Sequence, residues 1–328
     1  MTALVTANDL FRRVNHVIPS IEWATMAEDV DAIQRLKRER NAVILAHNYM
    51  RPEIFHGVSD IVGDSLALAR EATTVQADVI VLAGVHFMAQ SAAILSPEKT
   101  VLLPRLDAGC PLVDAATVES VRLMREKEPE ALFVTYINSS AEVKALSDVC
   151  CTSSNALQIV NNQPAGKKIV MLPDGNLARH TSSVTGREVI AWEGCCPVHQ
   201  ALTPQEVIAL KQEFPEAPFA AHPECRPDVL ALADFVGSTS AILKFARESG
   251  ARTIIIGTEA GILDKLRKDS PDKQFVLASE ALLCADMKKI TLDDIEKSLI
   301  TMQPAVTVSR KISRAAKKTL DRMLSLSS

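Results

Sequence analysis

Short apolar runs alternate along the chain with longer segments in which apolar residues recur at helical spacing. In the first third of the chain, three apolar runs stop at polar residues or turns: 42–46, 78–84 and 100–104. Such runs are typical of parallel strands that are buried on both faces. Residues 1–40 and the segment that begins at residue 66 have helical patterns. The pattern therefore predicts a strand–helix–strand–helix–strand module that follows N-terminal helices.

The same order of elements returns twice. Two further sets of apolar runs follow, at 131–135, 168–172 and 188–191, and at 218–221, 253–256 and 274–277. Two polar landmarks recur at spacings of 88 and 86 residues: Asp60, Asp148 and Asp234, and Ser65, Ser153 and Thr239. Because both sets of residues recur at the same spacings, the sequence indicates one supersecondary unit that occurs three times.

The repeat predicts an α/β fold made of three similar three-layer parallel-sheet modules. We expect modules at residues 26–110, 111–197 and 198–290, with an N-terminal helix (1–25) and a C-terminal helix (291–328) that both pack on the first. Because ligands bind at the carboxyl ends of parallel strands, a pseudo-threefold arrangement would place the active site at the common centre of the modules.

Composition limits the function classes. The 328 residues are 47% apolar and carry a net charge of −4, which gives no general attraction for nucleic acid or anionic membranes. Asp9, Arg12 and Arg13 interrupt the apolar start, which argues against a signal peptide, and no apolar run reaches the length of a membrane span. Seven cysteines without an export signal predict reduced thiols or metal ligands in a cytoplasmic protein.

Three isolated cysteines, Cys110, Cys196 and Cys284, are separated by 86 and 88 residues. Their thiolates suit either a Cys3His zinc site with His199 as fourth ligand or an iron–sulfur cluster with one open iron. The alternative is three buried structural thiols. Cys196 is preferred to its neighbour Cys195 because it keeps the spacing and, like Cys110, precedes a proline. The other three cysteines are assigned to structure: Cys150, Cys151 and Cys225.

Polar residues at the predicted strand ends would line the same cavity: His47 and Tyr49, Tyr136 and Asn138, and His222 and Glu224. For a histidine the alternative is a core residue satisfied by backbone, whereas a buried glutamate needs a partner or a raised pKa. Ser65, Ser153 and Thr239 precede predicted helices and could hold anions, or simply cap those helices. No GxGxxG or P-loop pattern predicts a nucleotide.

Nine motifs together resemble the quinolinate synthase family from about residue 40 to about residue 290. They are AHNY (46–49), GDS (63–65), GVHFMA (84–89), DAGC (107–110), YINS (136–139), CTSSN (151–155), PDGNLA (173–178), GCCPVH (194–199) and HPEC (222–225). The resemblance implies three α/β domains about a pseudo-threefold axis and a [4Fe-4S] cluster held by three cysteines. It implies a transferase-type synthase that condenses iminoaspartate with dihydroxyacetone phosphate to quinolinate, phosphate and water in NAD biosynthesis, with functional coupling to an L-aspartate oxidase that supplies iminoaspartate.

By resemblance, Cys110, Cys196 and Cys284 are the cluster ligands, and Tyr49, His199 and Glu224 handle protons. The implied substrate-binding residues are His47, Ser65, Tyr136, Asn138, Ser153, His222, Ser238 and Thr239. Two alternatives remain open at this point. One is a hydro-lyase that acts on another small carboxylate with the same open iron, and the other is a zinc-stabilised binding module without catalysis. Neither nucleic acid nor a membrane is expected as a partner.

Overall fold

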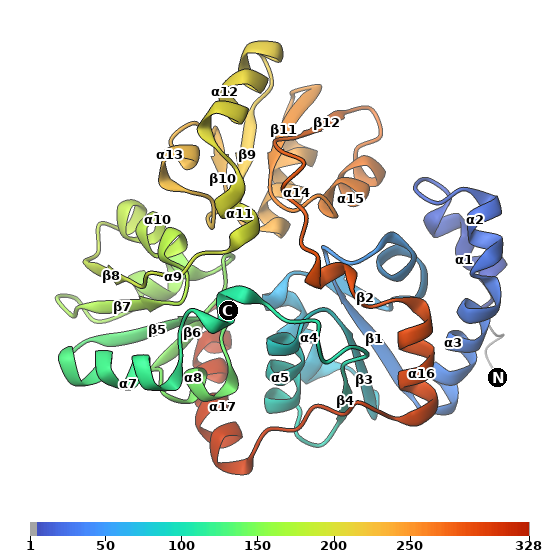
Figure 1. Ribbon diagram of the computed structural model, residues 1–328, viewed down its shortest axis with the longest axis horizontal. Helices are drawn as coiled ribbons and strands as arrows, with labels where there is room; N and C mark the ends of the chain where they lie inside the picture. The colour runs from blue at the N-terminus through green and yellow to red at the C-terminus, as the bar shows by residue number, and fades with distance from the viewer. Residues whose placement is uncertain (1–4, 328) are drawn as a thin grey trace. The chain divides into compact units, whose positions relative to one another are not determined.

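The computed structural model describes residues 5–327, so the first four residues of the expected helix 1–25 and the last residue of 291–328 lie outside the described part. The chain divides into two compact units. Unit 1 comprises Met1–Gly109 and Cys284–Val308, and unit 2 comprises Cys110–Leu283 and Ser309–Ser328. Unit 1 contains one four-stranded sheet and unit 2 contains two (Figure 1).

The sheet of unit 1 has the order β2-β1-β3-β4, and all its strand pairs are parallel. Its strands are β1 (Ala42–His47), β2 (Ile61–Gly63), β3 (Val79–Ala83) and β4 (Thr100–Leu102). Its helices are α1 (Ala7–Val14), α2 (Ser20–Thr25), α3 (Ala27–Glu39), the π-helical η1 (Glu53–Val58), α4 (Ser65–Thr74), α5 (His86–Leu95), the short η2 (Asp286–Lys288) and α16 (Leu292–Thr301). The central strand β3 is buried along its whole length, as its unbroken apolar sequence requires.

Unit 2 contains two parallel sheets of the same topology, β6-β5-β7-β8 and β10-β9-β11-β12. Their strands are β5 (Leu132–Tyr136), β6 (Val149–Cys151), β7 (Ile169–Leu172), β8 (Val189–Ala191), β9 (Phe219–Ala221), β10 (Phe235–Val236), β11 (Thr253–Gly257) and β12 (Gln274–Leu277). The helices are α6 (Pro111–Asp114), α7 (Val118–Lys127), α8 (Ala141–Ala145), α9 (Ala156–Asn161), α10 (Gly175–Thr185), α11 (Pro197–Ala201), α12 (Pro204–Glu213), α13 (Pro227–Leu230), α14 (Thr239–Glu248), α15 (Ile262–Asp269) and α17 (Arg310–Leu326).

The predicted α/β class and the three parallel sheets are confirmed. Each sheet, however, has a fourth strand at one edge that the apolar pattern did not predict: β2, β6 and β10. These strands contain only two or three residues. At these places only two or three apolar residues stand between polar residues or glycine (61–62, 149–151 and 235–236), fewer than the run of about four to eight residues by which a buried strand is recognised.

The repeated aspartates explain why these short edge strands are held in place. In each module a first-strand backbone amide donates to the aspartate carboxylate at 2.8 Å, the donors being Ile44, Phe133 and Phe219. A cation from the preceding helix donates to the same carboxylate and to the carbonyl two residues before it: Lys37, Arg125 and Lys211. These cations are also 88 and 86 residues apart. The repeated aspartates Asp60, Asp148 and Asp234 therefore have a structural role.

We expect Asp60→Ala to lower the free energy of unfolding by about 1–3 kcal/mol, because it leaves the Ile44 amide without its acceptor and Lys37 without its counter-ion. Asp234→Ala is the matched control. Its loss should be smaller, since the Asp234 and Lys211 side chains are 48% and 31% exposed, against 36% and 8% for Asp60 and Lys37. Urea unfolding of the two variants measures the difference, and equal losses would contradict this account.

The C-terminal segment does not pack as the sequence analysis expected. Helix α16 lies against α3 in unit 1, but α17 lies against α8 and β6 of the second sheet in unit 2 (Figure 1). Its buried face includes Ala316, Leu320 and Met323, and Thr319 Oγ1 lies 3.3 Å from Cys150 Sγ. The prediction that residues 291–328 pack on the first module is therefore wrong for α17. Its amphipathic pattern defined an apolar face without defining which sheet that face covers.

None of the helices within residues 5–327 combines the length and apolar character that a membrane span requires.

Candidate functional site

The cysteine-bearing loop before α11 is held against the end of β7 by a close backbone approach. The amide of Gly175 donates to the carbonyl of Gly194 at 2.7 Å. A Cβ on Gly175 would lie 2.2 Å from the Trp192 carbonyl oxygen, so only glycine allows this approach. The buried Asp174 caps α10 by accepting from the Leu177 amide at 2.7 Å, and its second oxygen accepts from the Cys196 amide at 3.0 Å. The loop therefore presents Cys196 at the carboxyl end of the sheet.

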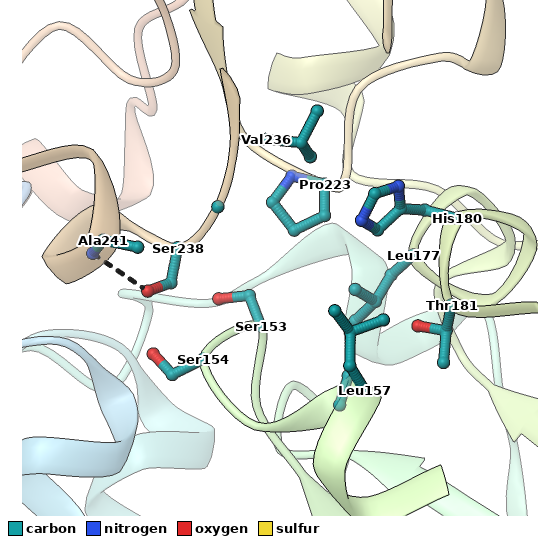
Figure 2. A pocket seen from close by; sticks show the side chains of 12 residues that line it. Ser153, Ser154, Leu157, Leu177, His180, Thr181, Pro223, Val236, Ser238 and Ala241 are labelled. Atoms are coloured by element: carbon teal, nitrogen blue, oxygen red, sulfur yellow. Dashed lines mark hydrogen bonds between the residues drawn. The ribbon is translucent and has the colours of Figure 1, made fainter. Parts of the chain in front are cut away.

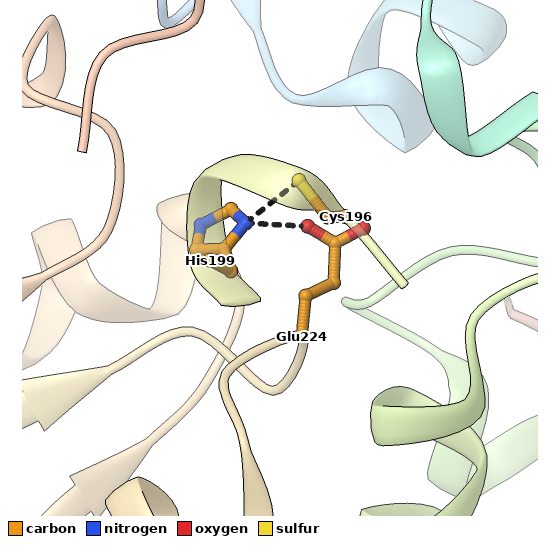
Figure 3. A group of neighbouring side chains, drawn as sticks. All are labelled: Cys196, His199 and Glu224. Carbon is orange, nitrogen blue, oxygen red and sulfur yellow. Dashed lines mark hydrogen bonds and ion pairs between the residues drawn. The ribbon is translucent and has the colours of Figure 1, made fainter. Parts of the chain in front are cut away.

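Cys196, His199 and Glu224 form a compact group in unit 2 (Figure 3). His199, on the first turns of α11, places Nδ1 3.3 Å from Cys196 Sγ and 2.9 Å from Glu224 Oε2. Glu224 follows β9, and both it and His199 are buried. The three ligand atoms all lie within 4.8 Å of one another, close enough to hold one metal ion.

The group is supported by hydrogen bonds from three other segments. His199 Nε2 lies 2.9 Å from Thr258 Oγ1, just after β11, which fixes the orientation of the imidazole ring. His222 stacks on His199 with ring centroids 4.6 Å apart, and its Nδ1 lies 3.3 Å from Glu224 Oε2. Asn176 donates to the Glu224 carbonyl at 3.1 Å. Glu224 Oε1 is buried and has no hydrogen-bond partner within residues 5–327.

Two carboxyl groups in this site have opposite environments. Burial alone would raise the pKa of Glu224, but the charge and hydrogen bonds of His222 and His199 outweigh it and hold that pKa below its ordinary range. Burial, aided by the negative charge of Glu224, raises the pKa of Asp174 to about 8. Glu224 is therefore the anion of the pair, and its Oε2 lies within hydrogen-bonding distance of both histidines.

All seven cysteines lie in the described part of the chain and carry reduced thiols. They fall into two groups by burial. The thiols assigned to structure from the sequence are fully buried: Cys150, Cys151 and Cys225. The other four are partly exposed: Cys110, Cys195, Cys196 and Cys284. Within unit 2, Cys196 interacts electrostatically with Cys110, whereas Cys195 interacts with Asp174 and Arg179.

A cavity of about 180 Å³ lies in unit 2 between the start of α9 and the start of α14. Figure 2 shows the hydroxyl groups of Ser153 and Ser238 on one side of it and the apolar chain of Leu157 on the other. His180 and Thr181 from α10 also line the cavity, and Thr181 Oγ1 is buried without a hydrogen-bond partner in the described residues. The structure thus brings together two of the predicted substrate-binding serines.

The helix starts differ from the sequence prediction in which residue caps them. Asp64 caps α4 by accepting from two amides, and Ser238 caps α14 by accepting from the Ala241 amide at 3.3 Å. Ser65 and Thr239 are the first helical residues, and Ser153 precedes the start of α9 by three positions. The idea that Ser65, Ser153 and Thr239 are the N-caps is wrong. For Ser65 and Thr239, the aspartate or serine one position earlier reaches the amides of the first turn, whereas the N-cap position of α9 is held by Asn155 without a side-chain cap.

In unit 1, His47 ends β1 and Tyr49 follows it, both buried. Their rings meet edge to face with centroids 4.7 Å apart, and the Tyr49 amide donates to His47 Nδ1 at 3.2 Å. Lys288 donates to the Tyr49 carbonyl, and Arg51 Nε donates to the Lys288 carbonyl at 2.7 Å. Both side chains are thereby fixed at the carboxyl end of the sheet, as the strand pattern predicted.

In unit 2, Tyr136 ends β5 and Asn138 follows in the next loop. The fully buried Lys144 of α8 donates to the Ser139 carbonyl at 2.6 Å and so fastens this loop. Burial lowers the pKa of Lys144 to about 8, while Cys150, Glu142 and Cys110 oppose the shift. Lys144 could not be recognised from the sequence, because no sequence pattern shows that its side chain lies on the buried face of α8.

Sequence reasoning also missed Asp174 and Thr258 as parts of the site. The spacing of Asp174 before Leu177 is that of an N-cap, which could have identified its first role. Its second contact, to the Cys196 amide, joins residues 22 positions apart and has no sequence signature. Thr258 meets His199 across 59 positions, which likewise depends on the fold alone.

The fold and the site define an α/β protein with a cysteine–histidine–carboxylate group at the carboxyl ends of parallel strands. The family described as "Quinolinate synthetase A protein" matches residues 31–325. A quinolinate synthase of Geobacter sp. (strain M21) is 53% identical over 302 residues, which is 92% of this chain and 98% of that protein. The chain belongs to the quinolinate synthetase A family.

Quinolinate synthases of two other organisms are also similar to this chain. "Quinolinate synthase 1" of Mesorhizobium japonicum is 48% identical over 321 residues, 98% of each chain. The quinolinate synthase of Methanosarcina barkeri (strain Fusaro / DSM 804) is 48% identical over 300 residues, 92% of this chain and 98% of that protein. The similarity therefore extends over nearly the whole length of this chain and of each of these relatives.

Proposed function

We propose that this chain is a quinolinate synthase, which condenses iminoaspartate with dihydroxyacetone phosphate to give quinolinate, phosphate and water in NAD biosynthesis. The observation that carries the proposal is the 48–53% identity to quinolinate synthases over at least nine-tenths of the chain. The names of these relatives favour this reaction over another hydro-lyase and over a binding module without catalysis.

The thiols fit the [4Fe-4S] cluster that this function requires. Three cluster ligands must be reduced and open to incoming iron, and Cys110, Cys196 and Cys284 are reduced and partly exposed while the structural cysteines are fully buried. The electrostatic interaction between Cys110 and Cys196 is consistent with two ligands of one cluster. When bound, a cluster with one open iron supplies a Lewis acid for substrate oxygens.

The chain's own residues would move protons and hold anions. Glu224, whose Oε2 lies 2.9 Å from His199 Nδ1 and 3.3 Å from His222 Nδ1, would take part in moving a substrate proton together with these two histidines. His199 can pass that proton on, and Tyr49 would act as a further acid–base group. The substrate carboxylates, phosphate and hydroxyls would be bound by His47, Ser65, Tyr136, Asn138, Ser153, His222, Ser238 and Thr239.

Four expectations stay predictions from the sequence. They are the pseudo-threefold arrangement with its central active site, the module boundaries, the cytoplasmic location and the functional coupling to an L-aspartate oxidase.

Product analysis tests the proposed reaction. The anaerobically purified chain should form quinolinate and phosphate from iminoaspartate and dihydroxyacetone phosphate together. Omission of either substrate should abolish product. Consumption of only one of them, without quinolinate, would favour the hydro-lyase alternative and contradict the proposal.

The corrected caps give a prediction that separates stability from substrate binding. Ser238→Ala removes the cap of α14, so it should lower the free energy of unfolding by about 1 kcal/mol in addition to raising KM, because Ser238 is also a proposed substrate-binding residue. Thr239→Ala leaves that cap in place, so its unfolding should be nearly unchanged while KM rises, if Thr239 binds a substrate anion beside the helix N-terminus. Thermal unfolding and steady-state kinetics of both variants measure the two effects. A stability loss with unchanged KM in Thr239→Ala would remove Thr239 from the binding site.

A further inference from the structure

We propose that Cys196, His199 and Glu224 form a mononuclear Zn²⁺ site when the chain carries no iron–sulfur cluster. This ligand set differs from the Cys3His zinc site considered from the sequence, because it takes one thiolate, one imidazole and one carboxylate. All three ligands belong to unit 2. Neither Cys110 nor Cys284 is in this group, so the proposed zinc site needs neither of them.

The separations of the donor atoms suit zinc. With metal–ligand bonds of about 2.0–2.3 Å, neighbouring donors in a tetrahedral site lie about 3.3–3.6 Å apart. His199 Nδ1 lies 3.3 Å from Cys196 Sγ and 2.9 Å from Glu224 Oε2 (Figure 3). The third separation, between Cys196 Sγ and the Glu224 carboxylate, is at most 4.8 Å, so the cysteine and glutamate side chains would close toward each other when the ion binds. A mixed sulfur, nitrogen and oxygen set favours Zn²⁺ over Mg²⁺, which takes oxygen ligands.

The surroundings of the three ligands resemble the supporting contacts of known zinc sites. A metal-bound histidine usually donates its other ring N–H to an oxygen, and Thr258 Oγ1 lies 2.9 Å from His199 Nε2 for this purpose. A bound ion would take Cys196 as its thiolate and His199 through the lone pair of Nδ1. Glu224 Oε1, buried and without a hydrogen-bond partner in residues 5–327, is a second carboxylate oxygen that the ion could bind.

Three protein ligands converge among residues 5–327, so the fourth position of a tetrahedral ion would be open to water or a small anion. Because Cys196 is also a proposed cluster ligand, zinc and cluster would exclude each other. Zinc bound at this site would therefore block cluster assembly. That consequence rests on the proposed cluster, whereas the zinc site itself does not.

Zinc titration of the full-length, cluster-free chain tests the site, with a chromophoric chelator as competitor and Co²⁺ as a spectroscopic probe. We expect one Zn²⁺ per chain and a thiolate-to-Co²⁺ absorption band, with no binding of Mg²⁺. Cys196→Ser, His199→Asn and Glu224→Gln should each weaken zinc binding by about a hundredfold or more. Thr258→Val should weaken it by about 10–100-fold through the lost contact to His199.

Cys110→Ser and Cys284→Ser are the discriminating controls, and both should bind zinc within about twofold of the parent chain. Loss of zinc in either would show that the three cysteines hold the ion and would overturn the proposed ligand set. Circular dichroism of each variant separates a lost ligand from a lost fold. In a second assay, one equivalent of Zn²⁺ should reduce iron uptake during anaerobic cluster reconstitution, and a chelator should restore it. Failure of the second assay alone would count against the cluster assignment of Cys196 and leave the zinc site intact.

Discussion

Cys196→Ser should yield a colourless, inactive protein with almost no bound iron. A serine hydroxyl cannot replace a thiolate as a cluster ligand at neutral pH, and a cluster held by only two protein thiolates loses its iron readily. Cys196 is the cysteine whose sulfur lies 3.3 Å from His199 Nδ1 and interacts with Cys110. Iron and sulfide content, visible absorption and anaerobic turnover measure the loss.

Cys195→Ser is the matched control, since it removes the neighbouring thiol from the same loop. The Cys195 thiol interacts with Asp174 and Arg179, so its replacement should keep both the cluster and the turnover. Iron loss in Cys195→Ser would mean that the sequence register of the middle repeat is displaced by one residue. The assignment of His199 to the active site would then be wrong as well.

Glu224→Gln should lower quinolinate formation by about a hundredfold or more while the iron content stays normal. Glutamine has nearly the same shape but cannot accept the proton that the carboxylate takes, and loss of a positioned base typically has this scale. It also removes the ion pairs of Glu224 with His199 and His222. Steady-state kinetics on anaerobic, iron-replete protein give the comparison.

Tyr49→Phe should behave in the same way if its hydroxyl moves a proton. The ring contact with His47 and the backbone contacts of residue 49 do not involve that hydroxyl, so the fold of the strand end should be kept. Near-normal turnover in either variant would remove that residue from the proposed mechanism.

The sequence predicted the strands that form the centre of each sheet, because runs such as 79–83 and 254–256 are apolar without interruption. It did not predict β2, β6 and β10, where the apolar run is only two or three residues long and polar residues or glycine flank it. The position of α17 was wrong for a different reason. Amphipathic spacing defines the buried face of a helix, but the partner of that face depends on which sheet surface is left uncovered by other helices.

The residues of the site were predictable to the extent that they end strands or recur in the repeat. Glu224 and His222 follow β9, and the Cys196 position follows from the spacing of the cysteines. The residues that hold these side chains and loops in place were not predictable from the sequence. Thr258 contacts His199 from the segment just after β11, and the fully buried Lys144 belongs to α8, which packs against α17. Such contacts join residues that are distant in sequence and carry no local pattern.

Anaerobic purification, followed by iron, sulfide and quinolinate measurements on one preparation, tests the central claim most directly. We predict a brown protein with about four iron and four sulfide ions per chain, as expected for one [4Fe-4S] cluster. The same preparation should form quinolinate from iminoaspartate and dihydroxyacetone phosphate. A colourless chain without sulfide, or an iron-replete chain that forms no quinolinate from the two substrates, would contradict the account.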